Sequence, residues 1–423
     1  MDPDPSAPGD SRLARRLGTF DAVVIGLGSM IGAGIFAALA PAAAEAGSAL
    51  LSALALAAVV AFCNATSSAR LAARYPQSGG TYVYGRERLG PFWGYLAGWG
   101  FVVGKTASCA AMALTVGSYV WPAHSTVVAV GAVIGVTALA GAGVQKAAWA
   151  TRIIVAVVLA VLAAVVIVCV GDGVAAGGRL AVPGWSAGVL PAAGLLFFAF
   201  AGYARIATLG EEVRNPARTI PRAIAVALGL TLVVYAAVAI SVLVVLGPAE
   251  LAASADPLAQ AVAAAGSSWL VPVVRIGAAV ASVGSLLALF LGVTRTVLAI
   301  ARDRNLPPAL AAVHPRHRVP QRAQLAVGAV VAVLAATVDL RGAIGFSSFG
   351  VLVYYAVANA SAWTLPRSGH RLSRAIPAAG LAGCLVLAVT LPPDAVLIGA
   401  GVLVLGVVVR VLGRRASRGR PAH

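Results

Sequence analysis

Long apolar runs dominate the chain, and their apolar positions follow one another without alternation. Many of these runs extend over 16 residues or more. A helix needs about 20 residues to cross the hydrocarbon core of a bilayer. Only helices and closed barrels satisfy their backbone groups there, and barrel strands alternate apolar and polar positions. The pattern therefore predicts an all-α polytopic membrane protein.

Twelve apolar runs are long enough to be predicted as spans. The first six are Phe20–Ala44, Ser48–Ala69, Pro91–Val120, Val127–Ala142, Ile153–Val170 and Pro191–Gly210. The second six are Ile224–Leu246, Trp269–Ile300, Ala323–Thr337, Ala343–Leu365, Ala375–Leu391 and Ala395–Leu412. The loops between them are short, so we expect no separate soluble domain.

Charge is scarce and unevenly placed. Only 11% of the 423 residues are charged, whereas soluble domains average about 25%. The net charge of +17 would suggest nucleic acid as the partner of a soluble protein. Here Lys and Arg form short clusters between the apolar runs, so we expect a lipid bilayer as the partner and no nucleic acid.

The distribution of Lys and Arg predicts the orientation. With the N-terminus inside, 25 of the 31 basic residues fall in predicted cytoplasmic segments, and only Arg179 and Arg341 fall in external loops. This bias places both termini in the cytoplasm of a multi-pass plasma-membrane protein. Five arginines from Arg410 onward form a basic tail that we expect to bind anionic lipid. The remaining four basic residues lie within spans: Lys105, Arg205, Arg275 and Arg295.

The first span contains an unusual glycine pattern. Residues 26–36 read GLGSMIGAGIF, and each glycine weakens a helix by about 1 kcal/mol relative to alanine. Two interpretations are open at this point: Gly28 and Gly32 can form a close packing face, or the helix can unwind. A dinucleotide-binding fingerprint is excluded, because its third glycine would fall on Ile31 and no strand precedes it.

The sixth span carries a second interruption. Residues 197–205 read FFAFAGYAR, with a glycine and a charge at mid-depth. The first and sixth spans each begin a run of five and cross the bilayer in opposite directions, which is typical of inverted-repeat transporters. An unwound turn exposes N–H groups for a carboxylate and C=O groups for an ammonium. We therefore predict a site for an amino acid-like zwitterion between the two breaks.

Five segments carry a family resemblance. They are residues 28–36, YPQSGGTY at 75–82, the stretch 197–224 with GEEVRNP at 210–216, ARDRNLP at 301–307 with VHPR at 313–316, and Tyr354 and Tyr355 with Asn359. In this order they resemble the bacterial amino acid permeases of the amino acid–polyamine–organocation (APC) superfamily. The resemblance covers nearly the whole chain.

The resemblance implies the LeuT-type fold, with twelve transmembrane helices, a 5+5 inverted repeat and broken helices 1 and 6. The parts would be a cytoplasmic tail (1–19), the first repeat (20–170), the second repeat (191–365), spans 11 and 12 (375–412) and a basic tail (413–423).

The resemblance also implies a substrate-binding set. The substrate carboxylate would contact amides around Ala33 and Gly34. Phe198 falls where relatives place an aromatic gate, and Gly202 would be a hinge. The ammonium would contact carbonyls around Met30, Ile31, Phe200 and Ala201, and Gly32 completes the set.

The chain departs from its relatives at the coupling site. Several proton-coupled relatives carry a lysine in span 5, but Ile153–Val170 contains no Lys, Arg, His, Asp or Glu. Many relatives have an acid two residues after the span-6 glycine, where this chain has Ala204 followed by Arg205. Ser282 and Ser285 share a helix face and are weak candidates for holding a sodium ion.

Ionisable groups at bilayer depth cost roughly 3 kcal/mol or more and are functional candidates. Lys105 is either a titrating group facing the substrate cavity or a member of a buried ion pair. Arg205 does not deprotonate, and we expect it to pair with an acid rather than bind an anion. Arg275 lies near the external end of its span, and we expect it to snorkel outward. Lys105 is thus the mid-span base able to lose a proton.

Glu211 and Glu212 follow the sixth span, close to Arg214 and Arg218. We expect these four residues to form a cytoplasmic salt-bridge cluster that acts as a gate, in preference to contacting substrate.

The preferred function is a secondary active transporter of amino acids or related amines. We expect symport or exchange with the proton as the coupling ion, a monomer or dimer, and no cofactor, metal or catalytic residue. A membrane-embedded enzyme would need convergent acids, histidines or metal ligands at depth, and an ATP-driven pump would need a phosphate-binding loop that the chain lacks. A channel differs from a transporter in that it cannot accumulate substrate.

Overall fold

The protein is all-helical throughout the part that the structure describes. This computed structural model describes residues 17–75, 79–143, 148–175, 184–207, 209, 212–314, 317, 319–366 and 372–418. Within these ranges the backbone forms no strand, and Leu17 and Val213 form an isolated parallel bridge.

The helices follow the apolar runs of the sequence. The first half contains α1 (Thr19–Met30), α2 (Ala33–Ala37), α3 (Leu39–Ala46), α4 (Leu50–Arg74), α5 (Thr81–Leu89), α6 (Pro91–Val120), α7 (Ser125–Gly141) and α8 (Ala148–Ala175). The second half contains α9 (Val189–Phe200), α10 (Ala204–Ala207), α11 (Pro216–Ala253), α12 (Pro257–Ala264), α13 (Val271–Arg302), α14 (Gln321–Thr337), α15 (Leu340–Trp363), α16 (Leu372–Thr390) and α17 (Pro393–Arg418). Short 3₁₀ turns join several of them, of which Ala201–Tyr203 matters most below.

Ten helical segments of the described chain are long and apolar enough to cross a membrane. The other two predicted spans, the ninth and eleventh, coincide with the shorter apolar helices Gln321–Thr337 and Arg374–Thr390. Apolar helices at this density fit a polytopic membrane protein.

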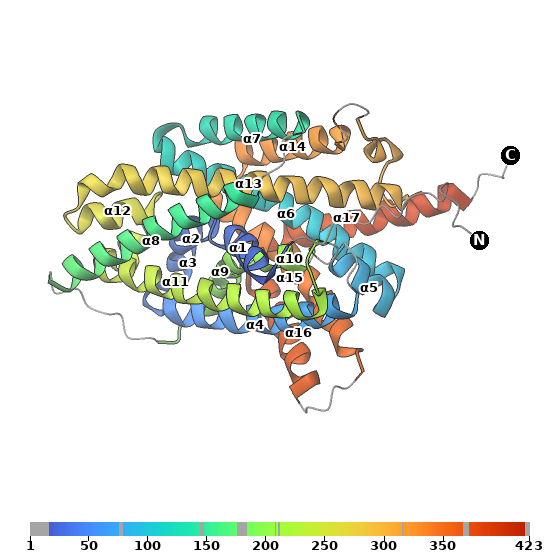
Figure 1. Cartoon of the computed structure of the whole chain (residues 1–423), viewed down its shortest axis with the longest axis horizontal. Helices are drawn as coiled ribbons and strands as arrows, with labels where there is room; N and C mark the ends of the chain where they lie inside the picture. Colours follow the sequence, from blue (N-terminus) through green and yellow to red (C-terminus); the bar gives the residue numbers. More distant parts are fainter. Residues whose placement is uncertain are drawn as a thin grey trace, which may run out of the picture.

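The broken helices lie in the middle of the bundle. In Figure 1 the pieces α1, α2, α9 and α10 lie centrally, while α7 and α14 lie together at one edge. The long helix α6 packs along α13 and α15, and α4 packs against α9 and α11. This arrangement surrounds the glycine-rich segments with protein, so their exposed backbone groups are shielded from lipid.

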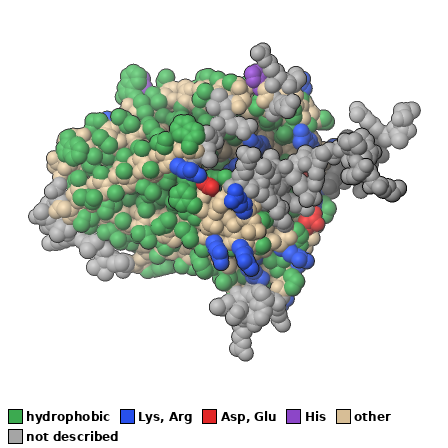
Figure 2. All heavy atoms as spheres, viewed as in Figure 1, with side chains coloured by type: hydrophobic (Ala, Val, Ile, Leu, Met, Phe, Trp, Pro, Cys, Tyr) green, Lys and Arg blue, Asp and Glu red, His purple; other side chains and the backbone are tan. Residues whose placement is uncertain are grey.

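The outer surface is apolar. Large hydrophobic side chains point outward from several helices, including Ile134, Ile167, Val233, Leu325 and Leu397. Figure 2 shows hydrophobic side chains over most of one face, with Lys and Arg gathered toward the end where α5 lies. We call this the basic end. Such a surface suits lipid contact along the helices and water at the charged end.

Two helices lie where the sequence predicted loops. Helix α5 falls in the segment between spans 2 and 3, and α12 falls in the predicted external loop 247–268. Neither is long enough to cross a bilayer, so the length of apolar runs gave no signal for them. Helix α11 also begins at Pro216, before the apolar run that starts at Ile224, because its hydrogen-bonded turns include the polar residues ahead of that run.

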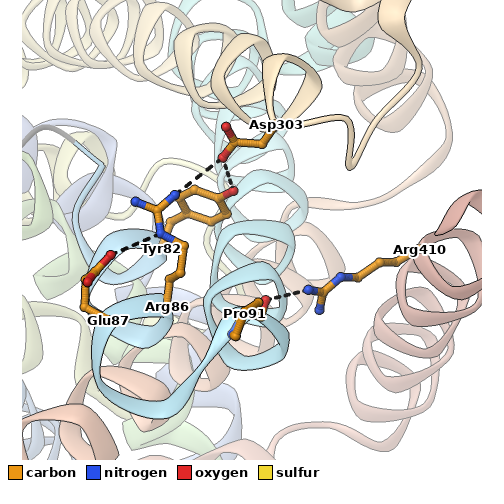
Figure 3. Close-up of polar contacts among 6 residues, drawn as sticks. All are labelled: Tyr82, Arg86, Glu87, Pro91, Asp303 and Arg410. Atoms are coloured by element: carbon orange, nitrogen blue, oxygen red, sulfur yellow. Dashed lines mark hydrogen bonds and ion pairs between the residues drawn. The ribbon is translucent and has the colours of Figure 1, made fainter. Parts of the chain in front are cut away.

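The basic tail differs from the prediction at Arg410. Its side chain is buried against α6, where Nη2 donates to Pro91 O at 2.6 Å (Figure 3). The guanidinium also lies over the Tyr95 ring. The Tyr95 hydroxyl donates to Gly406 O at 2.7 Å, and Trp99 Nε1 donates to Val402 O at 2.9 Å. Arg410 therefore fixes α17 to α6 and is not an exposed lipid anchor.

Candidate functional site

The first break falls at Ile31 and Gly32, between α1 and α2. Gly32 has φ −82° and ψ −128°, which is not helical. Ser285 of α13 fits against this turn, and its Oγ donates to Gly28 O at 3.0 Å. A Cβ at Gly32 would lie 1.8 Å from Ser285 Oγ. The absence of a side chain at Gly32 therefore permits the close approach of Ser285 on α13.

The second break is the 3₁₀ turn Ala201–Tyr203 between α9 and α10. A Cβ at Gly202 would lie 2.3 Å from Ser29 O, and a Cβ at Gly34 would lie 2.7 Å from Ala199 Cα. These are backbone contacts between the first and sixth spans, so the two breaks cross each other directly. Both interpretations of the glycine pattern describe the structure. Gly28 and Gly32 pack closely against neighbouring helices, and the first span is interrupted between α1 and α2.

Tyr235 of α11 bridges the two breaks. Its hydroxyl lies 2.5 Å from Met30 O and 3.1 Å from Ala199 O, and its side chain is buried. It supplies a donor to carbonyls that have no helical N–H partner at an interruption. The sequence prediction missed this residue, because one tyrosine in an apolar run carries no signal of which neighbour it meets.

Lys105 of α6 points at the second break. Its side chain is 6% exposed, and Nζ donates to Ala201 O at 3.4 Å. The Tyr355 hydroxyl of α15 donates to the same oxygen, also at 3.4 Å. None of the ion pairs between described residues includes Lys105.

A cavity of about 370 Å³ lies at the crossing of the broken helices. From the predicted set it is lined by Met30, Gly34, Phe198, Ala201, Gly202, Lys105, Arg205, Glu212 and Ser285. Ile31, Gly32, Ala33, Phe200 and Ser282 lie beside it, buried, without lining it. The sequence-predicted residues are thus brought to one place from α1, α2, α6, α9, α10 and α13, the 3₁₀ turn Ala201–Tyr203 and the segment before α11.

The cavity extends toward the basic end. Its wall continues from the breaks to Gly79 and Tyr82 beside α5 and to Ile300 near the end of α13. At the opposite end, the Tyr119 hydroxyl donates to Phe36 O at 3.2 Å, and the two rings meet edge to face. Arg341 also pairs there with Glu45, joining α15 to α3.

Arg275 is 41% exposed at its side chain and also pairs with an acid that the sequence did not indicate. Its Nη2 lies 2.8 Å from Asp256 Oδ2, and the Asp256 side chain is only 4% exposed. The pair ties α13 to the start of α12. A buried carboxylate needs such a partner, and α12 is the element that the sequence did not predict.

Glu212 lies on the cavity wall with Arg205 and Arg295. Its carbonyl oxygen accepts the Leu17 N–H at 3.1 Å, and Arg214 N–H donates to Leu17 O at 2.9 Å. These bonds join the segment before α1 to the segment after α10. Glu211 lies outside the described residues. The predicted cluster is therefore placed in part, with Glu212 facing the cavity and the Arg214 side chain exposed.

The basic end also holds a polar cluster that joins α5 to α13 (Figure 3). The Tyr82 hydroxyl donates to Asp303 Oδ2, and Arg86 Nη1 lies 3.7 Å from the same oxygen. Burial and the Asp303 carboxylate raise the pKa of Tyr82 to about 12. Tyr82 therefore stays protonated and remains a donor at every physiological pH.

The two serines of α13 are placed differently. Ser285 donates to Gly28 O, whereas the Ser282 hydroxyl is buried without a hydrogen-bond partner among the described residues. No group of three or more His, Cys, Asp or Glu that could hold a metal occurs in the part of the chain that the structure describes.

Sequence comparisons identify the family of the chain. The profile of a family described as amino acid permease matches residues 17–415. An uncharacterized transporter of Mycobacterium tuberculosis is 69% identical over 96% of this chain and 94% of its own length. A branched-chain amino acid permease of Bacillus subtilis is 26% identical over 88% of this chain and 85% of its own. The human cationic amino acid transporter 4 is 30% identical over 82% of this chain and 59% of its own. The chain therefore belongs to the amino acid permease family of the APC superfamily, and it is a multi-pass membrane transporter and not an enzyme.

Proposed function

We propose that the protein carries amino acids across the cytoplasmic membrane by alternating access, with twelve spans in a LeuT-type arrangement of two inverted repeats. The observation that supports this best is the cavity at the crossing of two interrupted helices, reaching toward one end of the bundle. Broken helices around a mid-membrane site are the feature that such transporters share.

Substrate recognition would use the interrupted backbone. The N–H groups around Ala33 and Gly34 are candidates for the carboxylate, and carbonyls at Met30, Ile31, Phe200 and Ala201 are candidates for the ammonium. In the present state Tyr235 occupies Met30 O, and Lys105 with Tyr355 occupies Ala201 O. Phe198 would close the site, and Gly202 would allow the sixth span to bend.

The conformation corresponds to an inward-facing state, if the basic end is cytoplasmic as its Arg residues favour. The opposite end would then be the closed external gate, held by Tyr119 on Phe36 and by Arg341 with Glu45. Leu17 would make the start of α1 move together with the segment around Glu212 and Arg214.

Coupling would depend on Lys105. It lies at the break with its ammonium beside Ala201 O, and the α8 segment Ile153–Val170 contains no Lys, Arg, His, Asp or Glu. A buried amine that is charged in one state and neutral in the other links the conformational change to a proton. An ion near Ser282 and Ser285 is the second candidate, because Ser282 has an unused hydroxyl among the described residues.

Transport by reconstituted protein tests this function. In proteoliposomes with an inward proton gradient, we expect a labelled amino acid to accumulate above its external concentration. Dissipating the gradient with an ionophore should stop accumulation and leave exchange with internal substrate. Passive equilibration alone, with no accumulation and no exchange, would indicate a channel and contradict the proposal.

Topology makes an independent prediction. Reporter fusions after Asn305 and at the C-terminus should report the cytoplasm, and a fusion after Asp256 should report the outside. The reason is that Asn305 lies at the basic end beside Asp303, whereas Asp256 lies at the start of α12. Opposite compartments for Asn305 and the C-terminus would contradict the twelve-span arrangement.

A further inference from the structure

The described wall of the substrate cavity carries more positive than negative side chains. Lys105, Arg205 and Arg295 line it, and Glu212 is the one acid among its described lining residues. Lys105 lies at the second break. Arg205 follows that break on α10, and Arg295 lines the cavity from α13. Because Glu212 lies on the same wall as the two arginines, the cation that lies apart from an acid among the described lining residues is Lys105.

Lys105 is a buried ammonium with little compensation. It is 6% exposed, and its hydrogen bond to Ala201 O is long at 3.4 Å. An ammonium has three donors, so at least one remains for a ligand in the cavity. A buried charge is costly unless it is paired with an opposite charge. An anionic group of the substrate would supply that partner.

The carbonyls at the breaks are already in use by the protein. Ala201 O faces both Lys105 Nζ and the Tyr355 hydroxyl, and Met30 O faces the Tyr235 hydroxyl. The site therefore presents donors more than acceptors. A substrate with extra positive charge would meet Lys105 and the arginines without a matching acceptor, whereas a substrate with extra negative charge would meet them as partners.

We infer that the substrate is an acidic amino acid, with two carboxylates and one ammonium, and that its second carboxylate pairs with Lys105. This inference rests on the proposed function and adds the substrate class. The inferred substrate class differs from that in the name of the human relative, which specifies cationic amino acids. A cationic substrate would bring a further positive charge into a cavity whose described lining has more cations than acids.

Binding to the purified full-length protein in detergent tests the inference. L-Glutamate and L-aspartate should bind about tenfold or more tightly than L-glutamine and L-asparagine, which have the same shape without the second charge. L-Arginine should bind more weakly still. Glutarate, which keeps both carboxylates and lacks the ammonium, should bind more weakly than glutamate. Isothermal titration or ligand-dependent thermal stability gives the affinities.

Variants identify the responsible charge. Lys105→Met should reduce the preference for glutamate over glutamine to less than about twofold, whereas Lys105→Arg, which keeps the charge, should retain it. Arg88→Met is the matched control, because it removes an exposed cation that bonds Thr364 at the basic end, outside the cavity. It should leave the preference unchanged.

Each other outcome has a definite meaning. Tighter binding of glutamine or arginine than glutamate in the parent protein would overturn the acidic substrate while leaving the amino acid transporter intact. An unchanged preference in Lys105→Met would overturn the role of Lys105. If no amino acid of any charge binds, the proposed function itself fails. The comparison of acid and amide in the parent protein needs no variant, so it stands even if Lys105→Met folds poorly.

Discussion

Gly202→Ala is expected to abolish amino acid uptake. The added Cβ would lie 2.3 Å from Ser29 O and 2.4 Å from Ser29 C, and both are backbone atoms that cannot rotate away. The sixth span would have to separate from the first at the point where the two breaks cross. Overpacking of this kind costs about 2 kcal/mol, so we also expect a lower melting temperature in detergent. Uptake into proteoliposomes and thermal unfolding measure the two effects.

Gly229→Ala on α11 is the matched control. Nothing lies within 4 Å of a Cβ at that glycine, and its position is exposed on the outer surface. Alanine favours a helix over glycine by about 1 kcal/mol, so uptake and stability should be kept or improved. Normal uptake by Gly202→Ala, with Gly229→Ala unchanged, would mean that the crossing of the breaks is not needed for transport.

Lys105→Met is expected to remove the pH dependence of accumulation while exchange of substrate continues. Methionine fills similar space but has no amine. The side chain at position 105, beside Ala201 O, can then no longer differ in protonation between the empty and loaded states. The charged and titrating groups around it are Cys109 one turn along α6, Tyr355 on α15 and Arg205 on the cavity wall. None of the three is expected to titrate near neutral pH, so none replaces Lys105. Uptake should be compared between pH 5.5 and 8 at saturating substrate, because affinity for an acidic substrate falls in this variant.

Lys105→Arg distinguishes binding from coupling. Arginine keeps the positive charge and does not deprotonate, so substrate preference should be retained while accumulation driven by a proton gradient is lost. If both variants keep the parent's pH profile and accumulate substrate normally, Lys105 is not the coupling group. The Ser282 and Ser285 pair would then be examined with sodium gradients.

The positions of the helices and of the two interruptions follow from local properties of the sequence. An apolar run of about 20 residues has to form a helix in a bilayer whatever surrounds it, because its backbone must bond internally. Glycines weaken a helix wherever they occur, so GLGSMIGAGIF and Gly202 indicate where α1 and α9 end without knowledge of their neighbours. Lys105 was identified in the same way, because a charged residue in the middle of an apolar run is costly and is therefore a candidate for a functional role.

The partners of these residues were decided by tertiary structure. Tyr235 meets Met30 O from 205 residues away in sequence, and Arg410 meets Pro91 O from 319 residues away. Such contacts depend on which faces of two helices come together, and an apolar run has no periodic signal that fixes its rotation in lipid. For the same reason the pairing of Arg275 with Asp256, beside the short helix α12, was not predicted. The sequence by itself therefore determined which segments form long apolar helices, where two of them break and where a charge is buried. The tertiary structure decided that the breaks cross, that Tyr235 bridges them and that Lys105 faces Ala201, because side-chain contacts between distant spans depend on packing and not on local composition.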